Sequence, residues 1–158
     1  MNITIIAVGK QRESFWRDAS AEYMKRLSCF GQIRVIEIDE ARLPDSPKPM
    51  EIAAALQKEG RRILEKVPKG AFYALCVEGK MFSSEQLAGF LEKMAESGTR
   101  ELVFIIGGAW GLSPEVKESA ALRLSFSKMT FPHQLVRVLL LEQLYRSFSI
   151  NHNGKYHK

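Results

Sequence analysis

Residues 102–112 read Leu-Val-Phe-Ile-Ile-Gly-Gly-Ala-Trp-Gly-Leu, a short apolar run that ends at two glycines. A strand that is buried between helices in a parallel sheet is apolar throughout, so residues 102–106 predict a strand covered on both faces. Glycines that follow a strand permit positive φ and let the backbone approach a ligand. The same glycines would also serve a tight strand-to-helix turn without any ligand. In open α/β sheets, ligands bind at the carboxyl ends of strands, which makes this turn the first candidate site.

Strand and helix patterns alternate along the rest of the chain. Further strands are predicted at residues 3–8, 33–38, 72–77 and 124–126. Helices are predicted at residues 14–29, 51–66 and 83–96, then in a short stretch that begins at Ser113-Pro114, and last from Pro132 to about Phe148. This alternation predicts an α/β fold, with a mostly parallel sheet and helices on both faces. No repeat, linker or break in composition divides residues 1–158, so we expect one domain.

The composition is that of a globular protein. Of the 158 residues, 46% are hydrophobic and 26% are charged. No apolar run approaches the ~18 residues that span a bilayer, and the N-terminus lacks the basic segment and cleavage site of a signal peptide. We therefore expect a cytoplasmic protein without a membrane partner. The two cysteines, Cys29 and Cys76, form no CxxC pair, which argues against zinc binding and thioredoxin-like chemistry.

The formal net charge of +5 lies entirely in the last quarter of the chain. Residues 1–118 contain 17 basic and 17 acidic residues, whereas residues 119–158 contain six basic residues, one acidic residue and all three histidines. A basic tail that is merely solvated is one explanation. The other is a surface that binds a polyanion, because Lys and Arg release counterions from the phosphates that they neutralise. The second is favoured because the candidate ligand loops lie in the same region.

Fingerprints of other enzyme classes are absent. The glycines at positions 107, 108 and 111 follow a GGxxG spacing instead of GxGxxG, and Gly79-Lys80 lacks the rest of a P-loop. Both observations disfavour an α/β oxidoreductase and a nucleoside triphosphatase. The chain has no GxSxG elbow. His152 and His157 have no nearby carboxylates that would complete a metal site.

The last predicted helix is apolar on nearly all sides. Its hydrophobic positions are Leu135, Val136, Val138, Leu139, Leu140, Leu141, Leu144, Tyr145 and Phe148. A helix of this kind must be covered nearly all round. One face of a small sheet cannot provide that cover, so we expect a second subunit to provide the rest. The alternative is a central helix that the chain buries by itself.

Several motifs in the sequence resemble those of one known family. GGxxGL follows the strand predicted at residues 102–106, LSFSKMTFPH spans residues 124–133, LVRVLLLEQLYRSFSI spans residues 135–150, and YHK ends the chain. Together with the first strand and with residues 22–27, they resemble the RlmH family of ribosomal large-subunit pseudouridine-N3 methyltransferases, which belongs to the SPOUT superfamily. The likeness covers essentially the whole chain.

The resemblance implies a fold and a donor site that the residue patterns alone do not show. The C-terminal segment would pass through a loop as a trefoil knot, S-adenosylmethionine would bind in the knot, and two copies of the chain would form a homodimer. By the likeness, the donor contacts are Leu75, Gly107, Gly108, Phe126, Ser127, Lys128, Met129, Thr130 and Phe131. No metal is implied, because the sulfonium methyl group is already activated and the enzyme mainly aligns donor and acceptor.

The resemblance also implies the methyl acceptor, which is N3 of a pseudouridine in a 23S rRNA stem-loop at the subunit interface of the assembled ribosome. A base, or a cation that stabilises the deprotonated nitrogen, is then expected near the methyl group. The candidates are His133, Arg137, Arg146, Tyr156 and His157. For His133 the alternative role is a cap or core hydrogen bond, and for the two arginines it is a structural pair with Glu142. The partners expected are 23S rRNA in the ribosome and a second copy of the chain, with neither DNA nor a membrane.

Two other functions are compatible with parts of the sequence. A non-catalytic RNA- or ribosome-binding factor would use the same basic C-terminal region but would not bind S-adenosylmethionine. An α/β oxidoreductase would bind a nicotinamide or a flavin, for which the fingerprints are absent.

Overall fold

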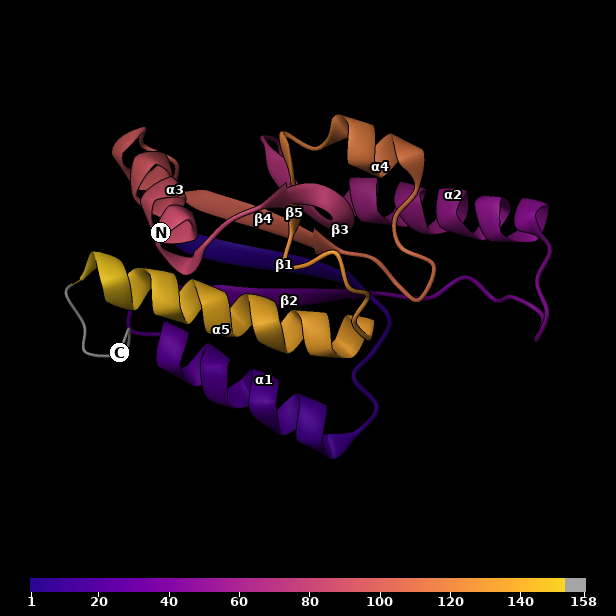
Figure 1. The fold of residues 1–158 in the computed structure, drawn as a ribbon, viewed down its shortest axis with the longest axis horizontal. Helices are drawn as coiled ribbons and strands as arrows, with labels where there is room; N and C mark the ends of the chain where they lie inside the picture. Colours follow the sequence, from indigo (N-terminus) through magenta and orange to yellow (C-terminus); the bar gives the residue numbers. More distant parts are fainter. Residues whose placement is uncertain (153–158) are drawn as a thin grey trace.

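The computed structural model describes residues 1–152, in which strands and helices alternate (Figure 1). The strands are β1 (Asn2–Val8), β2 (Ile33–Ile38), β3 (Phe72–Met81), β4 (Glu101–Ile106) and β5 (Leu122–Ser125). The helices are α1 (Ser14–Leu27), α2 (Pro49–Lys66), α3 (Ser84–Glu96), α4 (Pro114–Ser119) and α5 (His133–Asn151). The predicted α/β class is confirmed.

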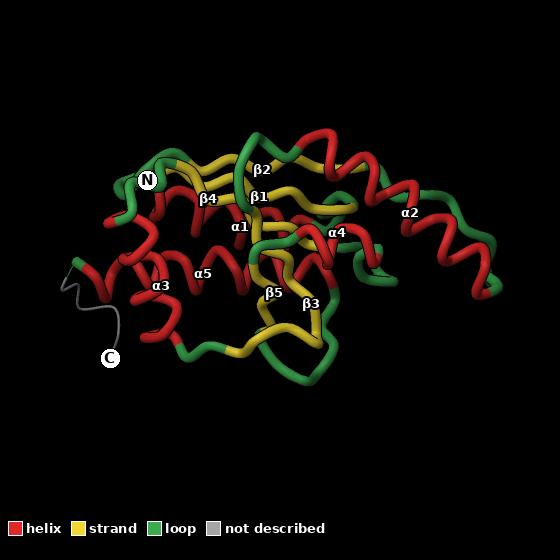
Figure 2. Tube along the Cα trace, turned by 90° about the horizontal axis from the view of Figure 1, so that it is seen from above, coloured by secondary structure: helices red, strands yellow, loops and turns green. Residues whose placement is uncertain are grey.

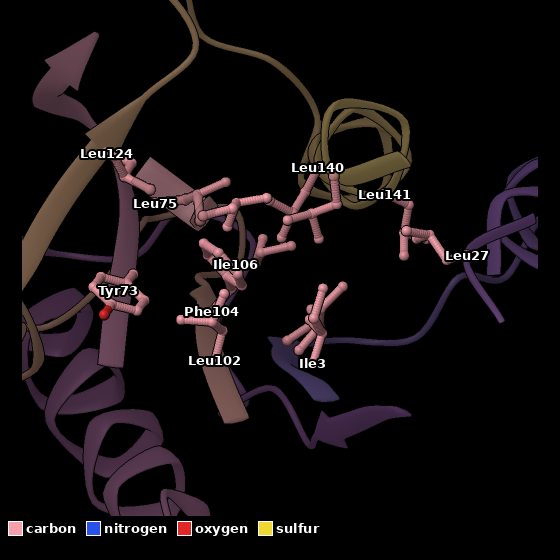
Figure 3. Packing of buried hydrophobic residues seen from close by; sticks show 14 of the residues in the cluster. Ile3, Leu27, Tyr73, Leu75, Leu102, Phe104, Ile106, Leu124, Leu140 and Leu141 are labelled. Carbon is pink, nitrogen blue, oxygen red and sulfur yellow. The ribbon is translucent and has the colours of Figure 1, made fainter. Parts of the chain in front are cut away.

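The strands form one sheet in the order β2-β1-β4-β3-β5, and all the strand pairs are parallel. Successive side chains of a strand point to opposite faces of a sheet. On one face, Ile3 and Phe104 pack in one cluster with Leu27 of α1 and Leu140 of α5 (Figure 3). Leu91 of α3 belongs to the same cluster. On the other face, Ile6 and Ile105 pack with α2 and α4, and Figure 2 looks down on this face. Helices therefore cover both faces, which explains why β4 is apolar from Leu102 to Ile106.

The last helix, α5, lies against the sheet between α1 and α3 (Figure 1). None of its residues is exposed, and Leu141 and Leu144 are fully buried. The chain therefore covers more of this helix than the sequence alone led us to expect. Val138 and Leu139 stay half-buried, and a second subunit as their cover stays a prediction. Within the described residues, no helix combines the length and the apolar composition that crossing a membrane requires.

The structure differs from the sequence prediction at two strands. β3 continues to Met81 instead of ending at Val77, and β5 begins at Leu122, two residues earlier than predicted. β5 pairs with β3 on both sides of a break in register that falls between Leu75 and Lys80. The residues in between form a bulge. A bulge depends on the neighbouring strand and has no periodic signal of its own, so the sequence pattern could not reveal it.

Candidate functional site

A cavity of about 730 Å³ opens at the carboxyl ends of β3, β4 and β5, and its size is typical of small-molecule sites. Three segments form it, namely the bulge of β3, the glycine turn after β4 and the loop from β5 to α5. They meet because parallel strands end at the same edge of the sheet. The proposed donor contacts that line this cavity are Leu75, Gly107, Gly108, Phe126, Ser127, Met129, Thr130 and Phe131. Lys128 is the one proposed contact that does not line it.

The turn after β4 is so tight that its first position requires glycine. A Cβ atom on Gly107 would lie 2.4 Å from the carbonyl oxygen of Gly111. Gly111 has φ +85°, and its N–H donates to the carbonyl oxygen of Gly108 at 3.0 Å. Ser113 then caps α4, and its Oγ accepts the N–H of Val116 at 3.3 Å. The glycines thus serve the turn itself and also bring its backbone to the wall of the cavity.

The bulge of β3 brings a charged pair to the cavity that the sequence analysis missed. Nζ of Lys117 on α4 donates a hydrogen bond to Glu78, which keeps the pKa of Glu78 below its ordinary value. Both residues line the cavity, as does Cys76. Burial raises the pKa of the Cys76 thiol, which keeps it protonated and a poor nucleophile. The pair could not be predicted from the sequence, because Glu78 and Lys117 are 39 residues apart and come together only through the bulge.

Serine hydrogen bonds hold the loop from β5 to α5 in shape. Oγ of Ser125 donates to the carbonyl oxygen of Ser127 at 2.8 Å, and Oγ of Ser127 accepts the N–H of Met129 at 3.0 Å. Phe126 and Phe131 from the same loop line the cavity, and the Met129 side chain is 72% exposed. An apolar surface as open as this suits a bound ligand or a partner surface.

A polar cluster beside the cavity joins the start of α5 to the ends of β1 and β2. Arg137 is buried, and it donates from Nη1 to Oε1 of Glu37 at 2.7 Å and from Nη2 to the carbonyl oxygen of Gly9 at 2.9 Å. His133 lines the cavity, and its buried Nε2 lies 3.5 Å from Oε1 of Glu40 without a hydrogen-bond partner. These contacts fix the position of α5, and with it the position of His133.

The two arginines among the catalytic candidates are held by ion pairs away from the cavity lining. Arg146 pairs with Glu142 at 2.6 Å, which is the structural pair expected as an alternative. Arg137 has Glu37 as its partner, so the alternative role of a structural pair with Glu142 does not hold for Arg137. Neither arginine lines the cavity. The last two candidates, Tyr156 and His157, lie outside the described residues.

A pH dependence follows from the burial of His133. Burial lowers its pKa below the ordinary 6.5; Glu40 and Glu13 oppose this shift, while Arg137 adds to it. Below pH 6.5 the unfolded chain then binds more protons at this position than the folded protein does. We expect the free energy of unfolding to fall as the pH drops from about 7 to about 5, and to fall less in His133→Gln. Chemical denaturation across this range measures the difference, and equal pH slopes for the two proteins would contradict it.

Comparisons with known proteins find relatives of the chain in sequence and in fold. Residues 1–157 match a family model described as "Predicted SPOUT methyltransferase". The chain is similar to a ribosomal RNA large subunit methyltransferase H from Pelotomaculum thermopropionicum, with 49% identity over 99% of this chain and 98% of that one. A protein of the same name from Bifidobacterium animalis subsp. lactis is 49% identical over the whole length of both chains. In structure the chain is similar to a tRNA methyltransferase from Aquifex aeolicus, with a TM-score of 0.55 and 15% identity over 92% of this chain and 70% of that one, a likeness of fold alone.

Proposed function

The chain belongs to the SPOUT methyltransferase family, and we propose that it methylates ribosomal RNA of the large subunit with S-adenosylmethionine as the methyl donor. The observation that carries this proposal is the cavity of about 730 Å³ at the strand ends, which joins three segments that are distant in the sequence. Relatives named ribosomal RNA large subunit methyltransferase H match nearly the whole chain at 49% identity, which supports the substrate class.

The residues of the cavity fit the donor in size and in chemistry. Leu75 and Phe131 form apolar walls on which an adenine ring can lie, and the turn after β4 has backbone groups for the edge of the ring. Glu78 and Lys117 place one charge of each sign in the cavity, which matches the ammonium and carboxylate of the amino-acid part. When bound, the donor supplies an activated methyl group. The protein then has to orient donor and acceptor and to exclude water.

We propose N3 of a pseudouridine in 23S rRNA of the assembled ribosome as the acceptor, as the resemblance implies. This nitrogen must lose a proton to become a nucleophile. His133 is the best placed candidate for accepting it, because it lines the cavity and its lowered pKa keeps it neutral at pH 7. Arg137 is held by Glu37, which indicates a positioning role for this arginine. Roles for Arg146, Tyr156 and His157 stay predictions.

We further propose that residues 1–158 act in the cytoplasm as one methyltransferase domain, with the C-terminal segment knotted through a loop, and that two copies form a homodimer. Apolar side chains near the cavity support a second copy as their cover. Phe126 and Met129 are exposed, and Val138 and Leu139 on α5 are half-buried. Large exposed apolar patches on a protein are usually interaction surfaces.

Ribosomes from a strain that lacks this protein test the proposed function. We expect the purified protein to transfer a radiolabelled methyl group from S-adenosylmethionine to their 23S rRNA, and mapping to place the label at a pseudouridine. Label on small-subunit RNA or on transfer RNA alone would contradict the substrate while leaving the reaction class intact. Calorimetry that finds no binding of S-adenosylmethionine would indicate a non-catalytic RNA-binding factor instead.

A further inference from the structure

A second cavity, of about 1100 Å³, lies at the carboxyl ends of β1 and β2, beside α2. We call it the basic groove after the five basic residues that line it. They are Lys10, Arg12, Arg42, Lys58 and Arg62. All of them come from residues 1–118, where basic and acidic residues are equal in number. The groove is therefore a basic surface separate from the basic C-terminal region.

Acidic residues also line the basic groove, but part of their charge is directed into the protein. They are Asp39, Glu40, Glu51 and Glu59. Glu59 is buried and accepts the N–H of Ala41 at 2.8 Å, and burial raises its pKa. Glu51 accepts the N–H of Lys48 at 2.7 Å at the start of α2. The backbone therefore holds both carboxylates that α2 contributes.

Within the part of the chain that the structure describes, three of the cations in the basic groove have no side-chain partner. Lys10, Arg42 and Lys58 are exposed, and within residues 1–152 none of the three side chains forms an ion pair or a hydrogen bond. Arg62 donates from Nη1 to the carbonyl oxygen of Asp39 at 2.8 Å, which leaves its charge unneutralised by that contact. Unpaired cations in a concave surface attract anions strongly, because the surrounding protein screens them less than water does.

The basic groove meets the cavity of about 730 Å³, the proposed donor site, at the turn after β4. Gly108, Ala109 and Trp110 line both cavities, and the Trp110 side chain is 55% exposed at this junction. We propose that the basic groove binds the sugar-phosphate backbone of the substrate RNA beside the methylated nucleotide, and that Trp110 stacks on an unpaired base there. This inference rests on the proposed function, which makes RNA the substrate of the adjoining cavity.

Single-stranded RNA fits both features of the groove. Lys and Arg neutralise its phosphates, and an aromatic side chain stacks on its unpaired bases regardless of their identity. Bases in loops are open to such stacking, whereas bases inside a duplex are not. An acidic protein surface would offer the cations a partner but has no unpaired bases on which Trp110 could stack, which is why we favour RNA.

A charge-neutral variant of the groove tests the inference. The groove variant is Lys10→Gln/Arg42→Gln/Lys58→Gln. Its matched control is Lys69→Gln/Lys93→Gln/Arg100→Gln, which removes the same three charges from exposed positions outside the groove. Binding of fluorescein-labelled poly(U) is measured by anisotropy between about 50 and 200 mM KCl. Each lost phosphate contact on a single strand lowers the salt slope by about 0.7, so we expect the slope of the groove variant to fall by about 2.

The outcomes separate the inference from the proposed function. Equal slopes for the groove variant and its control, or no binding of poly(U) by the wild type, would overturn the inference. A higher KM for ribosomes with an unchanged poly(U) slope would also overturn it, because the groove would then contact ribosomal protein. If the wild type methylates no ribosomal RNA, the proposed function is wrong, and the poly(U) slopes still decide whether the groove binds RNA.

Tryptophan fluorescence tests the stacking step. The chain has two tryptophans, so Trp16→Phe leaves Trp110 as the sole emitter. With S-adenosylhomocysteine at saturation, we expect poly(U) to quench the emission of Trp110. The groove variant should need a higher RNA concentration for the same quenching. An emission that RNA leaves unchanged would show that Trp110 does not stack on it.

Discussion

Gly107→Ala is expected to weaken the binding of S-adenosylmethionine by about 100-fold or more. The new Cβ atom would lie 2.4 Å from the carbonyl oxygen and 2.5 Å from the carbonyl carbon of Gly111, and 3.0 Å from Cγ of Leu112. The two closest contacts are backbone atoms, which cannot rotate away as the end of a side chain can. Overpacking of this kind costs about 3 kcal/mol. If the turn opens to relieve the strain and must close again to bind the donor, the same free energy lowers the affinity by about 100-fold. Calorimetry with S-adenosylmethionine measures the loss.

Two neighbouring glycines provide matched controls for this prediction. A Cβ atom on Gly108 would meet only the side chain of Val8, with Cγ1 at 3.1 Å and Cβ at 3.7 Å, so Gly108→Ala should have a smaller effect. A Cβ atom on Gly111 would meet nothing within 4 Å, and only its φ of +85° penalises alanine, by about 1 kcal/mol. Gly107→Ala should therefore be by far the most damaging of the three. If all three variants bind the donor like the wild type, the cavity is not the donor site.

Elements with their own periodic signal could be predicted from the sequence. The apolar run of β4 predicted a strand covered on both faces, and the structure places helices on both. Once strands are assigned, the rule that ligands bind at their carboxyl ends locates the cavity as well. The proposed donor contacts came from the family resemblance, since spacing alone could not distinguish a ligand turn from a structural turn at Gly107.

Contacts between distant segments could not be predicted, because they depend on tertiary packing. Glu37 and Arg137 are 100 residues apart, and nothing in either local sequence points to the other. The basic groove has the same origin. The formal net charge of residues 1–118 is zero. The net charge of a segment does not show which of its side chains the fold places on one surface. Lys10, Arg42 and Lys58 come together only in the folded chain.

Arg137→Met is expected to lower the free energy of unfolding by about 2 to 3 kcal/mol. The change leaves the carboxylate of Glu37 without its cation and the carbonyl oxygen of Gly9 without its donor. Removal of one partner from a buried ion pair costs about 3 to 5 kcal/mol, and we expect less here because the Glu37 side chain is 34% exposed and stays partly hydrated. Urea denaturation at neutral pH measures the change.

A double-mutant cycle decides whether Arg137 is a positioning residue or a catalytic residue. Glu37→Gln removes the charge that Arg137 neutralises and keeps a hydrogen-bond acceptor, so the cycle isolates the coupling between the two side chains. We expect about 1 to 3 kcal/mol, as is usual for neighbours in one polar network. A positioning role predicts that Glu37→Gln and Arg137→Met both reduce kcat, because both release the helix that holds His133 at the cavity. A catalytic role predicts a different result. Arg137→Met would then abolish methylation, the kcat of Glu37→Gln would equal that of the wild type, and both variants would be as stable as the wild type. In that case the guanidinium acts on the substrate itself.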